Sequence, residues 1–252
     1  MMNLQVSKKF KGKLCAYCAV ATATTDDHVF AREFFLLEDR HRLPKAPACQ
    51  KCNSGKSGLE HYLTAVLPFA AKHERAQESL RESLDRRLPR NNKLSNALMD
   101  SMKPAWMQEG SGLLLPTASI QFESVKLAEL LKLIVRGLTW HHWNAYVGAS
   151  DYADVMFMPD MGTLDFQDRI RRWGCSQRVV ENLGRGTLSY EGVRTADPPE
   201  LTVWGISMFG GAAIAYDKSR DGGPIEVSSR WWVVTAPPQV GAMLARGNRA
   251  KV

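Results

Sequence analysis

The sequence has no long apolar segment. Across its 252 residues, no run approaches the roughly 20 consecutive apolar residues that a membrane-spanning helix needs. The segment 1–13 carries lysines but no apolar stretch of the kind found in signal peptides. We therefore expect a soluble protein without a membrane partner, located in the cytoplasm.

Cysteine is also scarce, with five residues in the whole chain. Four of them form two CxxC pairs, Cys15 with Cys18 and Cys49 with Cys52, and Cys175 stands alone. In a chain without an export signal, this arrangement favours metal binding over disulfides. Two such pairs can meet around one tetrahedral Zn²⁺ ion, with an iron–sulfur cluster as the alternative. Four protein thiolates leave no open ligand position, so we expect this zinc to be structural.

Acidic residues are outnumbered by basic ones. The chain has 33 Lys and Arg against 26 Asp and Glu, for a net charge of +7. Much of the excess lies in the segment 1–56, which has ten basic and five acidic residues. This balance favours a polyanionic partner such as nucleic acid.

Hydrophobic patterning predicts an α+β protein in three parts. The first is a zinc-stapled domain (1–70), the second a charged helical connector (71–118), and the third an α+β domain of unassigned role (119–252). Apolar residues at helical spacing predict a long helix over 122–143. Antiparallel strands that pack on this helix are predicted at 186–193, 201–216 and 226–235.

The region between the two CxxC pairs holds a composite motif. It consists of Asp27-His28-Val29-Phe30, on a predicted strand, and of Asn53 directly after the second pair, at the start of a predicted helix. Together with the run Pro47–Lys56, these residues resemble the zinc-bearing branch of the HNH (ββα-metal) endonucleases. The resemblance implies a ββα-metal domain that hydrolyses DNA, with RNA as the alternative substrate.

The same resemblance implies roles for individual residues. His28 would be the general base, because a neutral imidazole can take a proton from water. Asp27 and Asn53 would hold a catalytic Mg²⁺ or Mn²⁺ ion through oxygen atoms. Lys51, Lys56 and the free N–H groups at the start of the helix would bind substrate phosphates.

One position of the family pattern is not filled in the usual way. HNH enzymes usually have a middle Asn or His in the loop before the second CxxC pair, and the segment 38–45 contains no Asn. His41 is the residue there that could orient His28, and the other interpretation is a surface histidine in a charged loop. A chain without the middle residue would be a zinc-stabilised nucleic-acid-binding protein with impaired catalysis, which is the alternative function.

Three further features are interpreted as structural. Adjacent side chains on a helix diverge by about 100 degrees, so His141-His142 favour packing over metal chelation. Trp231-Trp232 are interpreted as core residues of a strand. The arginines between 169 and 172 are interpreted as a solvated helix face.

Overall fold

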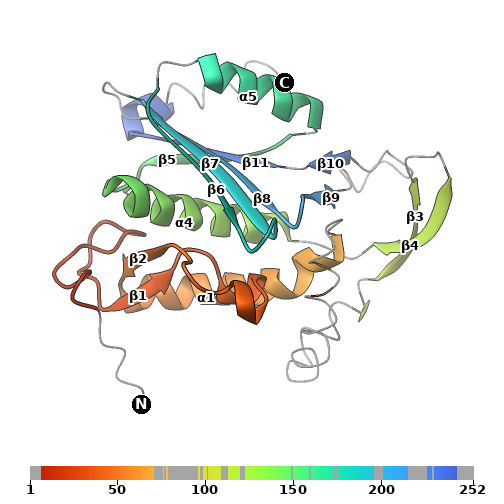
Figure 1. Cartoon of the computed structure of the whole chain (residues 1–252), viewed down its shortest axis with the longest axis horizontal. Helices are drawn as coiled ribbons and strands as arrows, with labels where there is room; N and C mark the ends of the chain where they lie inside the picture. Colours follow the sequence, from red (N-terminus) through yellow and green to blue (C-terminus); the bar gives the residue numbers. More distant parts are fainter. Residues whose placement is uncertain are drawn as a thin grey trace.

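A computed structural model gives the arrangement of the chain (Figure 1). It describes residues 7–70, 76, 78, 96, 99–100, 102–108, 113–119, 123–148, 150–158, 160–172, 175–195, 201–214, 226–228 and 230–242. These residues form the α+β structure that the sequence predicts, with an antiparallel sheet and four neighbouring cysteines. Most of the segment 71–101 lies outside the described residues. In the described part, no helix combines the length and the apolar character that crossing a membrane requires.

The N-terminal unit is a two-stranded hairpin followed by a helix. Strands β1 (Thr25–His28) and β2 (Lys45–Ala48) pair in antiparallel orientation. Cys49 alone separates β2 from helix α1 (Gln50–Val66), which packs back against β1. The strand and the helix that the motif predicts are therefore both present.

Helix α4 (Ser124–Trp143) lies in the middle of the molecule (Figure 1). It ends at Asn144, whose left-handed conformation (φ 50°) is a common helix terminator. One side of α4 packs against α1 and β2, and another side packs against the main sheet. The helix packs closely at Gly137, where an added Cβ would lie 3.0 Å from Cγ2 of Val29. A single cluster of buried apolar residues includes members from the N-terminal unit, α4 and the sheet, so all three share one core.

The main sheet has five antiparallel strands. Their order is β5 (Tyr152–Phe157), β11 (Trp231–Ala236), β8 (Thr202–Met208), β7 (Leu188–Thr195) and β6 (Cys175–Leu183). Helix α5 (Asp160–Arg172) covers the face of the sheet that is turned away from α4 (Figure 1). The three middle strands overlap the predicted ones, but the predicted strand over 226–235 is divided between β10 (Glu226–Ser228), which belongs to a separate sheet, and β11. The two edge strands were not predicted. An edge strand such as β6 exposes apolar residues (Val180 is 67% exposed), so its apolar and polar residues do not alternate regularly along the strand.

The predicted strand over 201–216 is interrupted by a turn. Phe209, Gly210 and Gly211 all have positive φ angles, which ends β8. The chain then forms β9 (Ala212–Ile214), which pairs with β10 (Glu226–Ser228) in a separate small sheet.

The end of the predicted helical connector is a hairpin instead of a helix. Strands β3 (Lys103–Gln108) and β4 (Leu114–Ser119) pair in antiparallel orientation and lie away from the main sheet (Figure 1). Pro104 and Pro116 explain the difference. Proline breaks the interior of a helix, whereas a strand with one unpaired side accepts it.

Large aromatic side chains fill the sheet side of the core. Trp231 and Trp232 are each 1% exposed, which confirms their interpretation as core residues. Trp204 and Trp232 each lie opposite a glycine on the neighbouring strand, Gly192 and Gly205. An added Cβ at these glycines would come within 2.4 Å and 2.7 Å of the respective indole rings. The glycines thus make room for the rings.

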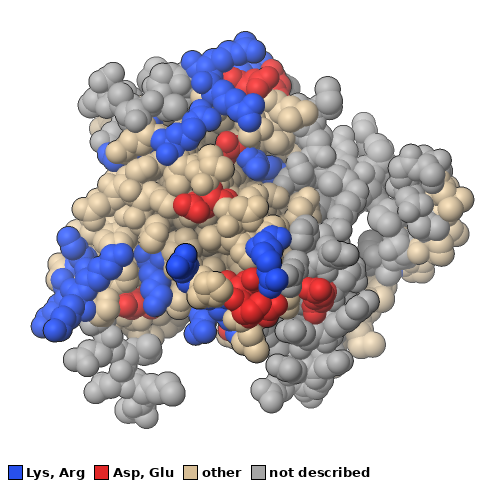
Figure 2. Space-filling view, viewed as in Figure 1, with Lys and Arg blue, Asp and Glu red and all other residues tan. Residues whose placement is uncertain are grey.

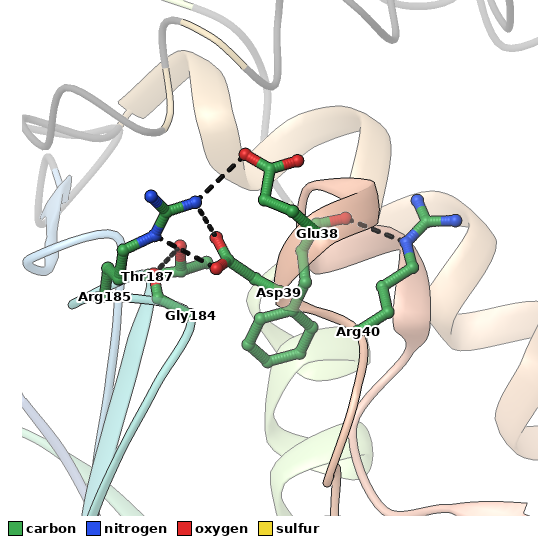
Figure 3. A network of polar contacts seen from close by, with 7 residues as sticks. Glu38, Asp39, Arg40, Gly184, Arg185 and Thr187 are labelled. Atoms are coloured by element: carbon green, nitrogen blue, oxygen red, sulfur yellow. Dashed lines mark hydrogen bonds and ion pairs between the residues drawn. The ribbon is translucent and has the colours of Figure 1, made fainter.

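The loop between β1 and β2 is held by the tip of the β6–β7 hairpin (Figure 3). Arg185, at that tip, contacts Asp39 at 3.1 Å and Glu38 at 3.0 Å. Beside it, Gly184 has a φ of +58°, and an added Cβ there would lie 2.7 Å from the Phe35 ring. The C-terminal sheet therefore contacts and supports the loop between β1 and β2.

Candidate functional site

The four cysteines of the CxxC pairs form one cluster. Their Sγ atoms all lie within 4.8 Å of one another. Zinc–sulfur bonds of about 2.3 Å in a tetrahedron place the sulfurs about 3.8 Å apart, so a small contraction closes the cluster around an ion. The cluster can hold a metal ion such as zinc. Because all four ligands come from the chain, the ion would have no open position for substrate.

Two tight turns present these thiols. In the first, the Cys15 N–H donates to the Ala21 carbonyl (2.7 Å) and the Ala19 N–H donates to the Cys15 carbonyl (2.8 Å). In the second, Cys49 is the N-cap of α1. A hydrogen bond from Ala16 N–H to the Pro47 carbonyl (2.8 Å) joins the two turns. The backbone thus brings the pairs together across 30 intervening residues (49 − 18 − 1).

The thiols differ in acidity. Burial raises the pKa of Cys18, but hydrogen bonds from the backbone of Ala21 and Val20 outweigh burial and lower this pKa to about 7. Burial is the largest cause of the raised pKa values of Cys15 and Cys52. The thiolate is the form that binds metal, so Cys18 is the ligand that loses its proton most readily of these three.

Asp27 and His28 face opposite sides of β1. Neighbouring side chains alternate along a strand, and here Asp27 is buried while His28 is half-buried. The Asp27 Oδ2 atom accepts a hydrogen bond from the Tyr17 hydroxyl and lies 3.0 Å from Nζ of Lys56. Both bonds that the described residues make to this carboxylate end on Oδ2.

Lys56 does not reach the surface. Its side chain is 0% exposed, and its ammonium bonds to Asp27, to the His28 carbonyl (2.8 Å) and to Glu60 (2.5 Å). An ammonium in this position is not available to a substrate phosphate, so the predicted role of Lys56 does not fit the structure. The physical reason is that two carboxylates on the inner side of α1 and β1 compensate its charge inside the protein.

His28 lies among positive charges. Burial lowers its pKa below the ordinary 6.5, and the charges of Lys45 and Arg32 lower it further. Lys45 is its partner across the hairpin, on β2. A lowered pKa keeps the imidazole neutral at physiological pH, which is the form that can accept a proton.

The remaining predicted residues lie at the start of α1 and in the loop. Lys51 is exposed and Asn53 is half-buried. The N–H of Asn53 already donates to the Cys49 carbonyl (3.0 Å), so any free N–H groups of the helix precede it. His41 is exposed, and no hydrogen bond or ring contact that the structure describes brings it to His28.

Three residues at the site were missed or set aside by sequence reasoning. Tyr17 and Glu60 complete the buried group around Asp27 and Lys56. The spacing of Lys56 and Glu60, four residues apart on a predicted helix, was a signal for this pair. The Nδ1 atom of His141, on α4, lies 3.0 Å from the carbonyl oxygen of Lys45. A carbonyl can only accept, so Nδ1 of His141 carries the proton.

His142 has a packing role, as expected. Its Nε2 atom lies 2.9 Å from the Tyr190 hydroxyl, and its ring contacts Tyr190 and Trp204. Burial, followed by the charge of His141, lowers the pKa of His142 to about 4. The two adjacent histidines therefore point to different partners, one toward β2 and one toward the sheet.

Comparison with family models, with curated proteins and with solved structures found no match to this chain.

Proposed function

We propose that this protein is a metal-dependent endonuclease of the HNH type that hydrolyses phosphodiester bonds in DNA. One observation carries the proposal. A ββα unit beside a four-cysteine cluster presents a half-buried histidine with a lowered pKa, His28, at the end of its first strand. The combination supplies a proton acceptor on a rigid support, which is what activation of water requires.

The residues of the chain would divide the reaction as follows. His28 takes a proton from a water molecule, and the hydroxide attacks the phosphorus atom. Asp27, through Oδ1, and Asn53 would hold Mg²⁺ or Mn²⁺, since both offer oxygen ligands. When bound, such an ion supplies charge that stabilises the leaving 3′ oxygen. Lys45 and Arg32, beside His28, attract the phosphate.

The distribution of charge supports a nucleic-acid substrate. Figure 2 shows that Lys and Arg side chains gather over the N-terminal unit and over α5. The exposed basic residues of these two regions include Lys8, Lys9, Lys11, Lys13, Arg169, Arg171 and Arg172. The lysines lead directly into the first CxxC pair, so they lie close to the zinc cluster. Contacts with phosphates through such side chains weaken as salt rises.

The second candidate is a zinc-stabilised nucleic-acid-binding protein without catalysis. The ion pair between Asp27 and Lys56 favours it, because an ammonium at 3.0 Å repels a divalent cation from the same carboxylate. The surface position of His41 favours it too, since nothing in the loop then orients His28.

Incubation of the zinc-loaded protein with supercoiled plasmid distinguishes the two candidates. Under the nuclease proposal, wild type nicks the plasmid with Mg²⁺ or Mn²⁺, and His28→Ala loses this activity. His61→Ala is the matched control, because His61 is an exposed histidine of α1. Equal nicking by wild type and His28→Ala would reject His28 as the base. Binding of plasmid without cleavage under either metal would establish the second candidate.

A further inference from the structure

Lys56 is a charged residue in the interior. It lies on the second turn of α1, and its side chain is 0% exposed. Removing an ammonium from water costs several kcal/mol, so a buried lysine is retained only where other groups compensate the charge. The compensating groups therefore indicate what Lys56 does.

Each of the three N–H bonds of this ammonium has an oxygen within reach. The acceptors are the His28 carbonyl at 2.8 Å, Asp27 Oδ2 at 3.0 Å and Glu60 Oε1 at 2.5 Å. An ammonium has three donors and no acceptor, so the set is complete. Lys56 thus binds both residues of the Asp-His pair and fixes them to α1.

The carbonyl of His28 points away from β2. In an antiparallel ladder, alternate residues bond to the partner strand, and Val29 is one that does, through its N–H to the Pro44 carbonyl. His28 is therefore at a position whose carbonyl faces outward from the hairpin. Lys56 supplies the donor that β2 does not, and this bond holds the backbone that carries the imidazole.

Asp27 is held in a second way. Lys56 and the Tyr17 hydroxyl both bond to Oδ2, which sets the rotation of the carboxylate. The other oxygen, Oδ1, then has a fixed direction as well. The carboxylate is therefore held in one orientation.

We propose that Lys56 is a positioning residue of the nuclease site: its ammonium fixes the His28 backbone and the Asp27 carboxylate to α1. This role rests on the proposed function for its kinetic consequence. Its structural consequence, a defined setting of His28, holds whether or not the protein cuts DNA.

The test compares Lys56→Met with Lys103→Met. Methionine keeps the length of the side chain and removes the charge, and Lys103 is an exposed lysine on β3 with no proposed role at the site. With both variants zinc-loaded and folded, Lys56→Met should lower kcat for plasmid nicking by about tenfold or more and leave the KM for DNA within a factor of about two. Lys103→Met should change neither kcat nor KM.

A second readout separates this inference from the nuclease proposal. NMR spectra of labelled histidine should show shifted His28 resonances in Lys56→Met, and wild-type resonances in Lys103→Met. If wild type never cuts DNA, the nuclease proposal fails and the position of the His28 resonances alone decides the role of Lys56. Nicking by Lys56→Met at the wild-type rate, or unchanged His28 resonances, would overturn the inference.

The variant that removes one charge can also fail to fold, because Asp27 and Glu60 then lose their counter-ion. In that case Lys56→Met is combined with Glu60→Gln, which removes a carboxylate together with the ammonium, and Glu60→Gln alone is the reference. The double variant should show the lower kcat and the shifted His28 resonances, and the reference should show neither. If the double variant does not fold either, Lys56 acts on stability alone and the positioning role is rejected.

Discussion

Gly137 of α4 and Val29, the residue after His28, are in direct contact. A Cβ added to Gly137 would lie 3.0 Å from Cγ2 of Val29 and 3.3 Å from Cε1 of Tyr17. Tyr17 in turn bonds to Asp27. The C-terminal half of the chain therefore contacts the side chain of the residue next to the proposed base, and the ring that holds the proposed metal ligand.

Gly137→Val tests this contact. The isopropyl group of valine has no space between α4 and the hairpin. Overpacking of this kind costs about 1 to 3 kcal/mol. We expect a lower free energy of unfolding in a denaturant titration. Glu129→Val, at an exposed position of the same helix, controls for the β-branched side chain and should cost only a few tenths of that. Equal effects of the two substitutions would show that α4 does not pack closely at Gly137.

Cys49→Ser tests the metal cluster. Serine is a poor zinc ligand, so the variant should lose the ion, and with it the support for the hairpin and α1. Zinc content by atomic absorption should fall from one ion per chain to near zero, and the melting temperature should fall as well. Cys175→Ser, which changes the cysteine outside the two CxxC pairs, should keep both values. A zinc-free variant with the wild-type melting temperature would contradict a structural role for the metal.

The pH dependence of nicking tests the environment of His28. The base must be neutral, so the rate should rise with pH and level off above the pKa of His28, which burial and then Lys45 and Arg32 place below 6.5. Removing a positive neighbour makes protonation easier and raises this pKa. Lys45→Gln should therefore move the acid limb of the profile to higher pH, and Arg169→Gln, on α5, should leave it in place. A limb that moves to lower pH in Lys45→Gln would refute the assignment.

Glu60 makes stability depend on pH. Burial raises its pKa from 4.5 to about 7, although Lys56 opposes the shift. Between these values the folded state holds a proton that the unfolded state has lost, so stability falls as pH rises through this window and is constant above it. One pKa unit corresponds to about 1.4 kcal/mol, so the rise from 4.5 to about 7 gives a loss on the order of 3 to 4 kcal/mol.

Glu60→Gln removes this titration. Its free energy of unfolding should change less than that of wild type between about pH 5 and about pH 8, measured by denaturant titration at both values. Glu129→Gln, an exposed glutamate on α4, should behave as wild type does. If Glu60→Gln loses as much stability as wild type over this interval, Glu60 does not titrate near neutral pH.

The features that the sequence predicted well are those set by local pattern. The CxxC spacing predicts the cysteine cluster, because four thiols at tight turns have few other arrangements. The apolar repeat predicts the start of α4 to within two residues. It predicts the last residue of α4 correctly. Strands β7, β8 and β11 follow from runs of β-branched and aromatic residues between turn signals.

The features that could not be predicted from the sequence depend on tertiary contacts. Lys56 has the pattern of a surface lysine, and only the packing of α1 on β1 places Asp27 and Glu60 around it. His141 reaches β2 because α4 crosses the hairpin, and nothing near it in the sequence indicates Lys45 as its partner. Both residues contact atoms more than 25 positions away along the chain.

The central position of α4 limits how the molecule can be divided. One side of α4 packs against elements of the N-terminal half of the chain, and another side packs against strands of the C-terminal half. The boundary between the two halves therefore runs through the interior and not along a linker. A zinc-bearing unit cut out after Ala70 would expose to water the surface that now meets α4. Grafting that unit onto another protein would therefore require carrying over this helix, which is encoded more than 50 residues downstream.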